Sequence, residues 1–268
     1  MNKENPGVFE AKKKNGEIYY RSSLTYKGKH ISLGSFDNKT DAGYAYLEGN
    51  ELLKDKSITV NKVIDFIDYY HLSFEKCVSI INFRDNGIYF ANPIYIEKKY
   101  FYYYLNTEDI YKFDADDLFF YASHKLMKRG NHLFVSSFGN QENILSRYGI
   151  RPHSVQDRDY RFKNDDKYDL RYSNVEVLNP YYGVERAGVK GKKKYKAVIN
   201  IKGKFVIGYY ETMEIAAVAY NKAVNCLKNK NVTSDYPLNT GLPFDKEEYI
   251  KIYESIRISE KITKFQND

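Results

Sequence analysis

The chain has 268 residues, of which 43% are hydrophobic and 29% are charged, and its formal net charge is +7. This composition is typical of a globular protein rather than a disordered one, and the length favours two or three domains. No run approaches the roughly 18 apolar residues of a membrane span, and the first residues lack the apolar region of a signal peptide. We therefore expect a cytoplasmic protein, nucleoid-associated if bacterial, without membrane contact.

Positive charge is concentrated in two stretches of the sequence. Residues 1–36 contain seven Lys or Arg against three Glu, and residues 181–208 contain eight against one. The rest of the chain is therefore net negative. Clustered cations indicate a polyanion-binding surface, because each contact with a phosphate releases a counterion. The alternative is that these cations only keep the protein soluble.

One short pattern occurs near each end of the sequence. The first copy has Gly-Val at residue 7, a strand-like segment over 20–26, Gly-Lys at 28, Leu-Gly at 33 and a helix-like stretch over 41–46. The second copy repeats this order, with Gly-Val at 183, a segment over 195–202, Gly-Lys at 203, Ile-Gly at 207 and an alanine-rich stretch over 215–220. The repeat predicts two copies of one small module around a different middle region.

Residues 195–202 alternate in character, which predicts a half-buried antiparallel strand. Lys202-Gly203-Lys204 supplies a tight turn into a second strand over 205–208, and Thr212 is a candidate cap for the following helix. The helix has apolar residues at three- and four-residue spacing, so it can lie across the sheet. Each module is therefore predicted to have three strands and one helix, with the other face of the sheet exposed and rich in lysine.

The middle region is aromatic and less basic. We expect a helix over 60–71, strands over 87–90, 93–96, 100–104 and 132–135, and a helix opening near Phe113 with Asp114 as its cap. The tyrosines at 100–104 could stack single-stranded bases, but alternate residues of a strand point opposite ways, so we interpret them as filling two faces of a sheet. Asp114, Asp116 and Asp117 fit the first turn of a helix better than a metal site.

These elements predict an α+β fold, in which two small modules of a three-stranded antiparallel sheet and a helix flank a central α+β domain. The predicted segments are residues 1–56, 57–179, 180–235 and 236–268. The last of these is expected to contain a helix over 244–265, which either packs on a module or pairs with a partner chain. We favour packing.

The second copy resembles the APETALA2/ERF DNA-binding domain over residues 180–228, and the first copy resembles it less closely, with Gly43 and Tyr44 replacing helix alanines. In that family a three-stranded sheet lies in the major groove, so the resemblance implies double-stranded DNA as the partner. Plant members place arginines and tryptophans where this chain has other residues, and the plant target sequence is therefore not implied. These positions are Glu185, Val198, Asn200, Lys204 and Val206.

Residues 161–178 resemble the HNH endonuclease core of mobile-element and phage homing enzymes, which also precedes an APETALA2/ERF module. Arg161 and Phe162 stand where that core has a His-His pair. An arginine stays protonated and cannot act as a general base, and a phenylalanine can neither accept a proton nor bind a metal. We therefore expect the nuclease activity to be lost, and we assign no catalytic residue, metal or cofactor.

Two alternatives remain open. One is an active homing-type endonuclease whose metal site is rebuilt from Asp165, Asp166, Asp169 and His153. The other is a protein-interaction module in which the outer face of the sheet binds another protein.

The first hypothesis is a sequence-specific DNA-binding protein, either a transcriptional regulator or a mobile-element-derived factor. Asn200 could pair with adenine, and Arg186 or Lys204 with guanine or phosphate. The candidate DNA-binding residues of the second copy are Arg186, Lys190, Lys192, Lys193, Lys194, Lys196, Asn200, Lys202 and Lys204. Those of the first copy, which we expect to grip DNA less strongly, are Lys12, Lys13, Lys14, Arg21, Ser23, Thr25, Lys27 and Lys29. Those of the middle region are Arg161 and Lys163.

Overall fold

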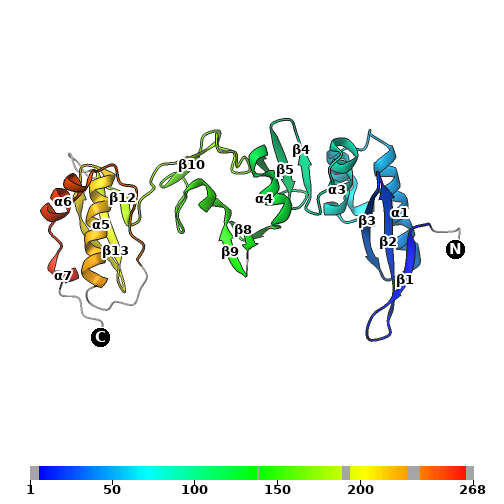
Figure 1. Ribbon diagram of the computed structural model, residues 1–268, viewed down its shortest axis with the longest axis horizontal. Coiled ribbons are helices and arrows are strands. Elements are labelled where there is room, and N and C mark those ends of the chain that lie inside the picture. Colours follow the sequence, from blue (N-terminus) through cyan, green and yellow to red (C-terminus); the bar gives the residue numbers. More distant parts are fainter. Residues whose placement is uncertain (1–5, 138, 189–193, 229–235, 264–268) are drawn as a thin grey trace. The chain divides into compact units, whose positions relative to one another are not determined.

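The structure is a computed structural model that describes residues 6–137, 139–188, 194–228 and 236–263 (Figure 1). It is an α+β protein built from small antiparallel sheets and helices, which confirms the predicted fold class. The chain forms two compact units, Met1–Ile144 with Phe162–Val175, and Leu145–Arg161 with Glu176–Asp268. These units differ from the four segments expected from the sequence. The difference arises because the first module shares its core with the helices that follow it, and the C-terminal helices share the core of the second module.

The first module is a three-stranded antiparallel sheet covered on one face by a helix (Figure 1). Leu24, Ile31 and Leu33 are buried in its core, which also contains residues of the helix. Gly49 lets the helix approach closely, because a Cβ there would lie 2.9 Å from Leu24 Cδ2. The elements are β1 Val8–Lys12, β2 Ile18–Tyr26, β3 Lys29–Phe36 and α1 Lys39–Lys54.

The first module is continued by helices that the sequence analysis predicted only in part. The helix expected over 60–71 is shorter, and α3 was not predicted, because all its residues from 77 to 84 are buried and leave no alternating polar face. The strand expected over 87–90 is wrong, since Gly87 ends α3 at a φ of +74° and irregular backbone follows. The elements are α2 Val60–Phe66, the short 3-10 helix η1 Ile67–Tyr69 and α3 Phe74–Asn86.

The tyrosine run forms β5, the central strand of a second sheet. Phe101 and Tyr103 are fully buried on one face, and Tyr100 and Tyr102 are half-buried on the other, as the alternation predicted. Asp114 is at the N-cap position of the short 3-10 helix Ala115–Asp117, but its side chain makes no capping hydrogen bond; its carboxylate instead accepts a hydrogen bond from the Tyr172 backbone N (2.7 Å). The elements are β4 Ile94–Ile96, β5 Tyr100–Tyr104, β6 Ile110–Asp114, η2 Ala115–Asp117 and α4 Leu118–Ser123.

A third sheet and a short two-stranded ribbon follow along the chain. The strand expected over 132–135 is present as part of β8. None of the described helices is both long enough and apolar enough to cross a membrane. The elements are β7 Leu126–Arg129, β8 His132–Ser137, β9 Asn140–Asn143, η3 Ile144–Tyr148, and the ribbon of β10 Tyr160–Phe162 with β11 Val175–Val177.

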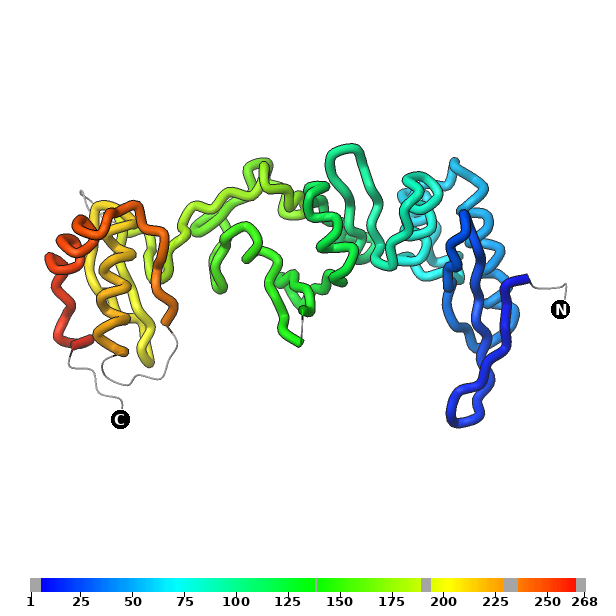
Figure 2. Tube along the Cα trace, viewed as in Figure 1, coloured from blue at the N-terminus to red at the C-terminus, as the bar shows by residue number. Residues whose placement is uncertain are grey.

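The second module repeats the architecture of the first. Thr212 Oγ1 accepts a hydrogen bond from the Ile215 backbone N (3.3 Å), which confirms the predicted cap. The helix α5 contacts the sheet on one side and the C-terminal helices on the other (Figure 2), so the tail packs on the module as expected, although as two short helices. The elements are β12 Val184–Arg186, β13 Tyr195–Asn200, β14 Lys204–Tyr210, α5 Met213–Lys228, α6 Lys246–Ser255 and α7 Glu260–Thr263.

The two modules share an unusual glycine contact. Gly7 and Gly183 both have left-handed backbone, with φ of +85° and +65°, and each carbonyl accepts a hydrogen bond from the middle strand (2.9 and 2.7 Å). Each glycine lies against a tyrosine ring of its own helix. A Cβ would approach Tyr46 in the first module to 2.4 Å and Tyr220 in the second to 2.1 Å. Only glycine fits this position, so the glycine of the repeated Gly-Val pair has a structural role.

A register shift recurs at the matching place in both sheets. It lies between Ser22 and Ser23 of β2 and between Ala197 and Val198 of β13. Agreement in a β-bulge as well as in topology supports a common origin of the two modules.

We predict that Gly183→Ala destabilises the second compact unit by about 2–5 kcal/mol. A left-handed non-glycine residue costs about 1–2 kcal/mol, and the overlap with Tyr220 and the Val198 carbonyl adds an overpacking cost of about 1–3 kcal/mol. Gly241→Ala is the matched control, since its φ of +67° is similar and a Cβ there would meet nothing within 4 Å. Denaturant unfolding of both variants measures the difference; equal losses would contradict the close contact.

Candidate nucleic-acid interface

The second sheet has one face against α5 and one face away from it. Ala197 and Ile199 are buried in the core with α5, so their neighbours Lys196, Val198 and Asn200 point the other way. Side chains paired across strands share a face, which extends this surface onto β12 and β14. The outer face of the second sheet thus comprises Glu185, Lys196, Val198, Asn200, Lys204, Val206 and Tyr209.

A carboxylate lies among the cations of this face. Lys196 Nζ is 3.0 Å from Oε2 of Glu185, and Lys204 Nζ is 2.7 Å from its Oε1. Burial raises the pKa of Glu185, but the hydrogen bonds from Lys204 and Lys196 outweigh burial and the net pKa is lowered. Two predicted DNA-binding lysines are therefore on the expected surface, but they share one anion.

The other predicted residues of the second module have mixed environments. Arg186, Lys194 and Lys202 are exposed. Asn200 Oδ1 accepts a hydrogen bond from the Gly203 backbone N (3.1 Å), so this side chain also holds the hairpin turn. Lys190, Lys192 and Lys193 lie outside the described residues.

The first sheet presents the corresponding face without an anion in the middle. Phe9, which pairs with Arg21, occupies the position of Glu185 and is 58% exposed. Among the described residues, no carboxylate forms an ion pair with Arg21, which is exposed. The outer face of the first sheet comprises Phe9, Arg21, Ser23, Thr25, His30, Ser32 and Ser35.

The lysines of the first module lie at strand ends and turns. Lys12 and Lys14 are exposed, and Lys13 pairs with Glu17 (3.1 Å). In the second hairpin, Lys27 Nζ lies 5.2 Å from the centre of the Tyr26 ring, and Lys29 Nζ lies 5.7 Å from that of Tyr89. Lys29 pairs with Tyr26, which packs against the core together with Tyr89, so Lys29 lies on the helix side of the sheet rather than on the predicted outer face.

The segment that resembles an HNH core is organised by Asn174. This residue is 4% exposed, and its Nδ2 donates to the carbonyls of Asp166 (3.2 Å) and Asp169 (2.7 Å). Arg161 pairs through Nε with Glu176 Oε2 (2.6 Å) and is exposed, as is Lys163. Both predicted phosphate-binding side chains are therefore accessible.

The residues of the alternative metal site do not form a cluster. Asp169 is 3% exposed, and its two carboxylate oxygens accept hydrogen bonds from Arg171 Nε (2.8 Å) and Nη2 (2.5 Å). Burial raises the pKa of Asp169, but the bonds from Arg171 outweigh it and the net pKa is lowered. Asp165 and His153 are both exposed. Within the described ranges, no three His, Cys, Asp or Glu side chains are placed to hold a metal ion.

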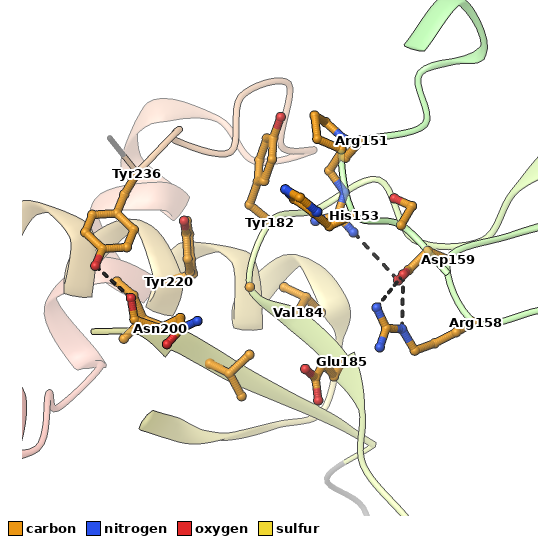
Figure 3. Close-up of a pocket in the computed structure, with 15 residues that line it drawn as sticks. Arg151, His153, Arg158, Asp159, Tyr182, Val184, Glu185, Asn200, Tyr220 and Tyr236 are labelled. Atoms are coloured by element: carbon orange, nitrogen blue, oxygen red, sulfur yellow. Dashed lines mark hydrogen bonds and ion pairs between the residues drawn. The ribbon is translucent and has the colours of Figure 1, made fainter. Parts of the chain in front are cut away.

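A cleft of about 330 Å³ beside β12 and β13 was missed by the sequence analysis (Figure 3). Asp159, which is 2% exposed, accepts hydrogen bonds from Arg158 Nη2 (2.7 Å) and Asn179 Nδ2 (2.9 Å). Arg151 stacks on Tyr182, with its guanidinium carbon 5.1 Å from the ring centre. The cleft joins the segment 151–159 to residues much later in the sequence, such as Asn200 and Tyr236, and these follow no motif, so no local signal could have predicted it. It brings two arginines to the β12 edge of the second sheet.

Neither a protein-family model, nor a curated protein, nor a solved structure matches this chain. We therefore infer its function from the geometry and charge of its own residues.

We predict that Asp169→Ala destabilises the first compact unit by about 1–3 kcal/mol, because it leaves Arg171 and Asn164 without an acceptor. Asp65→Ala on α2 is the control, since this carboxylate is exposed and its backbone is helical. Chemical denaturation at neutral pH measures both. A loss in the Asp169 variant no larger than in the control would contradict a structural role for this ion pair.

The same ion pair predicts a dependence on pH. The folded pKa of Asp169 lies below its ordinary value of 3.8, so its contribution is fully present above about pH 4 and is lost as the pH falls through the folded pKa. The stability difference between wild type and Asp169→Ala should therefore shrink on acidification below pH 4. A difference that is constant with pH would contradict this assignment.

Proposed function

We propose that this chain binds double-stranded DNA through the outer faces of its two small sheets, as a sequence-specific regulator or a factor derived from a mobile element. The observation that carries the proposal is the same in both modules. The helix covers one face of the sheet, and the opposite face carries exposed side chains and is bordered by cations.

The dimensions and chemistry of this face suit the major groove. The groove is about 12 Å wide and admits a small β-ribbon, whose side chains can reach base edges. In the second module the exposed Lys194 and Lys202 are available for phosphates, while Val206 and Tyr209, each 43% exposed, are available for bases. Phosphate contacts would position the sheet, and base contacts would supply specificity.

Two modules on one chain would strengthen binding. Once one sheet is bound, the second is held at a high effective concentration near the same duplex, and the combined affinity can exceed that of either module by orders of magnitude. The unlike side chains of the two outer faces, Phe9 and Ser32 against Glu185 and Val206, favour two different half-sites.

The resemblance of the modules to the APETALA2/ERF domain supports the same partner. In the HNH-like segment we assign phosphate binding to Arg161 and Lys163 rather than catalysis, because neither side chain is a general base at neutral pH. The ion pair of Asp169 with Arg171 favours this reading over the endonuclease alternative.

We predict that replacing Lys194, Lys196, Lys202 and Lys204 together by Gln weakens binding to duplex DNA and reduces its salt dependence. Each lost phosphate contact changes the slope of log K against log salt concentration by about 0.9, so the slope should fall by about two to four. Fluorescence anisotropy with labelled duplexes over a series of salt concentrations measures this.

The matched control replaces four exposed lysines of the same compact unit that lie on helices, namely Lys228, Lys246, Lys251 and Lys261. It makes the same change in net charge away from the sheet. An equal loss in both quadruple variants, or unchanged affinity in the first, would contradict DNA binding by the outer face of the second sheet.

A further inference from the structure

The two outer faces differ at one structurally equivalent position. Val184 pairs with Ala197 as Val8 pairs with Ser22, so the next residue of each first strand, Glu185 or Phe9, is equivalent. The sequence order alone showed only that Glu185 is one of the positions at which this chain departs from plant members. The structure shows what the carboxylate contacts.

Glu185 forms an ion-pair bridge across the sheet. It lies on β12, whereas Lys204 lies on β14, on the opposite side of the central strand β13. Lys196, on β13 itself, binds the same carboxylate. Val198 follows on that strand between Lys196 and Asn200, and it is only 8% exposed although it points away from α5. The Glu185–Lys204 ion pair therefore spans the central strand of the second outer face, from β12 to β14.

The first sheet has no such bridge. The equivalents of Glu185 and Lys204 are Phe9 and His30, and Ser23, the equivalent of Val198, is only half-buried. A duplex can approach the middle of the first sheet directly. On the second sheet it must first separate Glu185 from Lys204.

Opening the bridge has different consequences for different DNA contacts. A phosphate that binds Lys196 or Lys204 competes with the Glu185 carboxylate and is also repelled by it. The carboxylate therefore weakens phosphate contacts, which do not depend on the base sequence. An exocyclic amino group of a base is a donor, and a carboxylate in the major groove accepts from cytosine N4. Only a correct base therefore compensates for the lysine contacts that Glu185 loses.

We propose that Glu185 is a specificity-determining residue of the second module, which restrains Lys196 and Lys204 from binding phosphate in random sequences and accepts a hydrogen bond from cytosine N4 in the preferred site. This inference rests on the proposed DNA-binding function. It also assigns the two modules unequal roles. The first module binds phosphates with less selectivity, and the second recognises the base sequence.

The test is Glu185→Gln, compared with Glu254→Gln on α6, an exposed position that gives the same change of charge in the same compact unit. The readouts are the salt needed to elute each chain from immobilised heparin, the salt dependence of binding to a random-sequence duplex pool, and the ratio of affinities for wild-type-selected and random duplexes. Thermal unfolding followed by circular dichroism verifies that each variant folds.

We expect Glu185→Gln to elute from heparin at higher salt and to steepen the slope with random duplex by about one to two, since two lysines are released. The ratio of selected to random affinity should fall about tenfold, within the range for one lost base contact. Glu254→Gln should match wild type in all three readouts.

The failures of this inference and of the proposed function can be told apart. If wild type binds duplexes but Glu185→Gln behaves like Glu254→Gln, the role of Glu185 is overturned and DNA binding stands. If wild type binds no duplex at all, the proposed function is overturned, and the heparin elution alone then decides whether the carboxylate restrains the lysines.

A second variant introduces the restraining carboxylate into the first sheet. Phe9→Glu places a carboxylate opposite Arg21, in the register of Glu185 opposite Lys196. Compared with Phe9→Gln, it should lower the affinity for random duplex and reduce the salt slope by about one, as one phosphate contact is restrained. Equal binding by the two Phe9 variants would count against the electrostatic restraint.

Discussion

The close approach of helix and sheet in each module is the constraint on which the remaining geometry depends. A left-handed glycine lies under a tyrosine ring of the helix, at Gly7 with Tyr46 and at Gly183 with Tyr220. Small helix residues such as Ala216 and Ala219, both fully buried, remove the bulk that would separate the layers. Because one face of a three-stranded sheet is committed to this contact, only its other face is left to carry exposed side chains.

An exposed sheet face of this kind can bind a partner, and its charges determine which kind of partner it binds. The rims of both sheets carry lysines, but the middle of the second sheet is crossed by the ion pair of Glu185 with Lys204, and the middle of the first is not. The net positive charge counted along the sequence is larger in the second module and predicts stronger polyanion binding there. The ion pairs of Glu185 reduce this difference between the modules, because they occupy two lysines of the second outer face. The first outer face stays accessible, and the lysines of the second are restrained.

Much of the fold could be predicted from the sequence, because it depends on local patterns. The strand that begins at Tyr195, the Thr212 cap and the two-faced tyrosine strand are set by neighbouring residues, and all are present, although the first of these ends at Asn200 and buries Val198 as well as Ala197 and Ile199. The helix α3 could not be predicted in this way, since burial on every side removes the amphipathic signal. The Glu185 ion-pair bridge and the cleft of Arg151 and Asp159 depend on side chains that the tertiary structure brings together. No residue spacing in the sequence predicts them.

The surface that a duplex covers tests the account most directly. NMR spectra of the labelled chain, recorded during titration with a random-sequence duplex, report which backbone amides change environment. We predict the largest changes at Ser32 on the first outer face and at Val206 and Tyr209 on the second, with little change along α5. Changes confined to α5 and α6, or no change at any duplex concentration, would contradict the assignment of the outer faces to DNA.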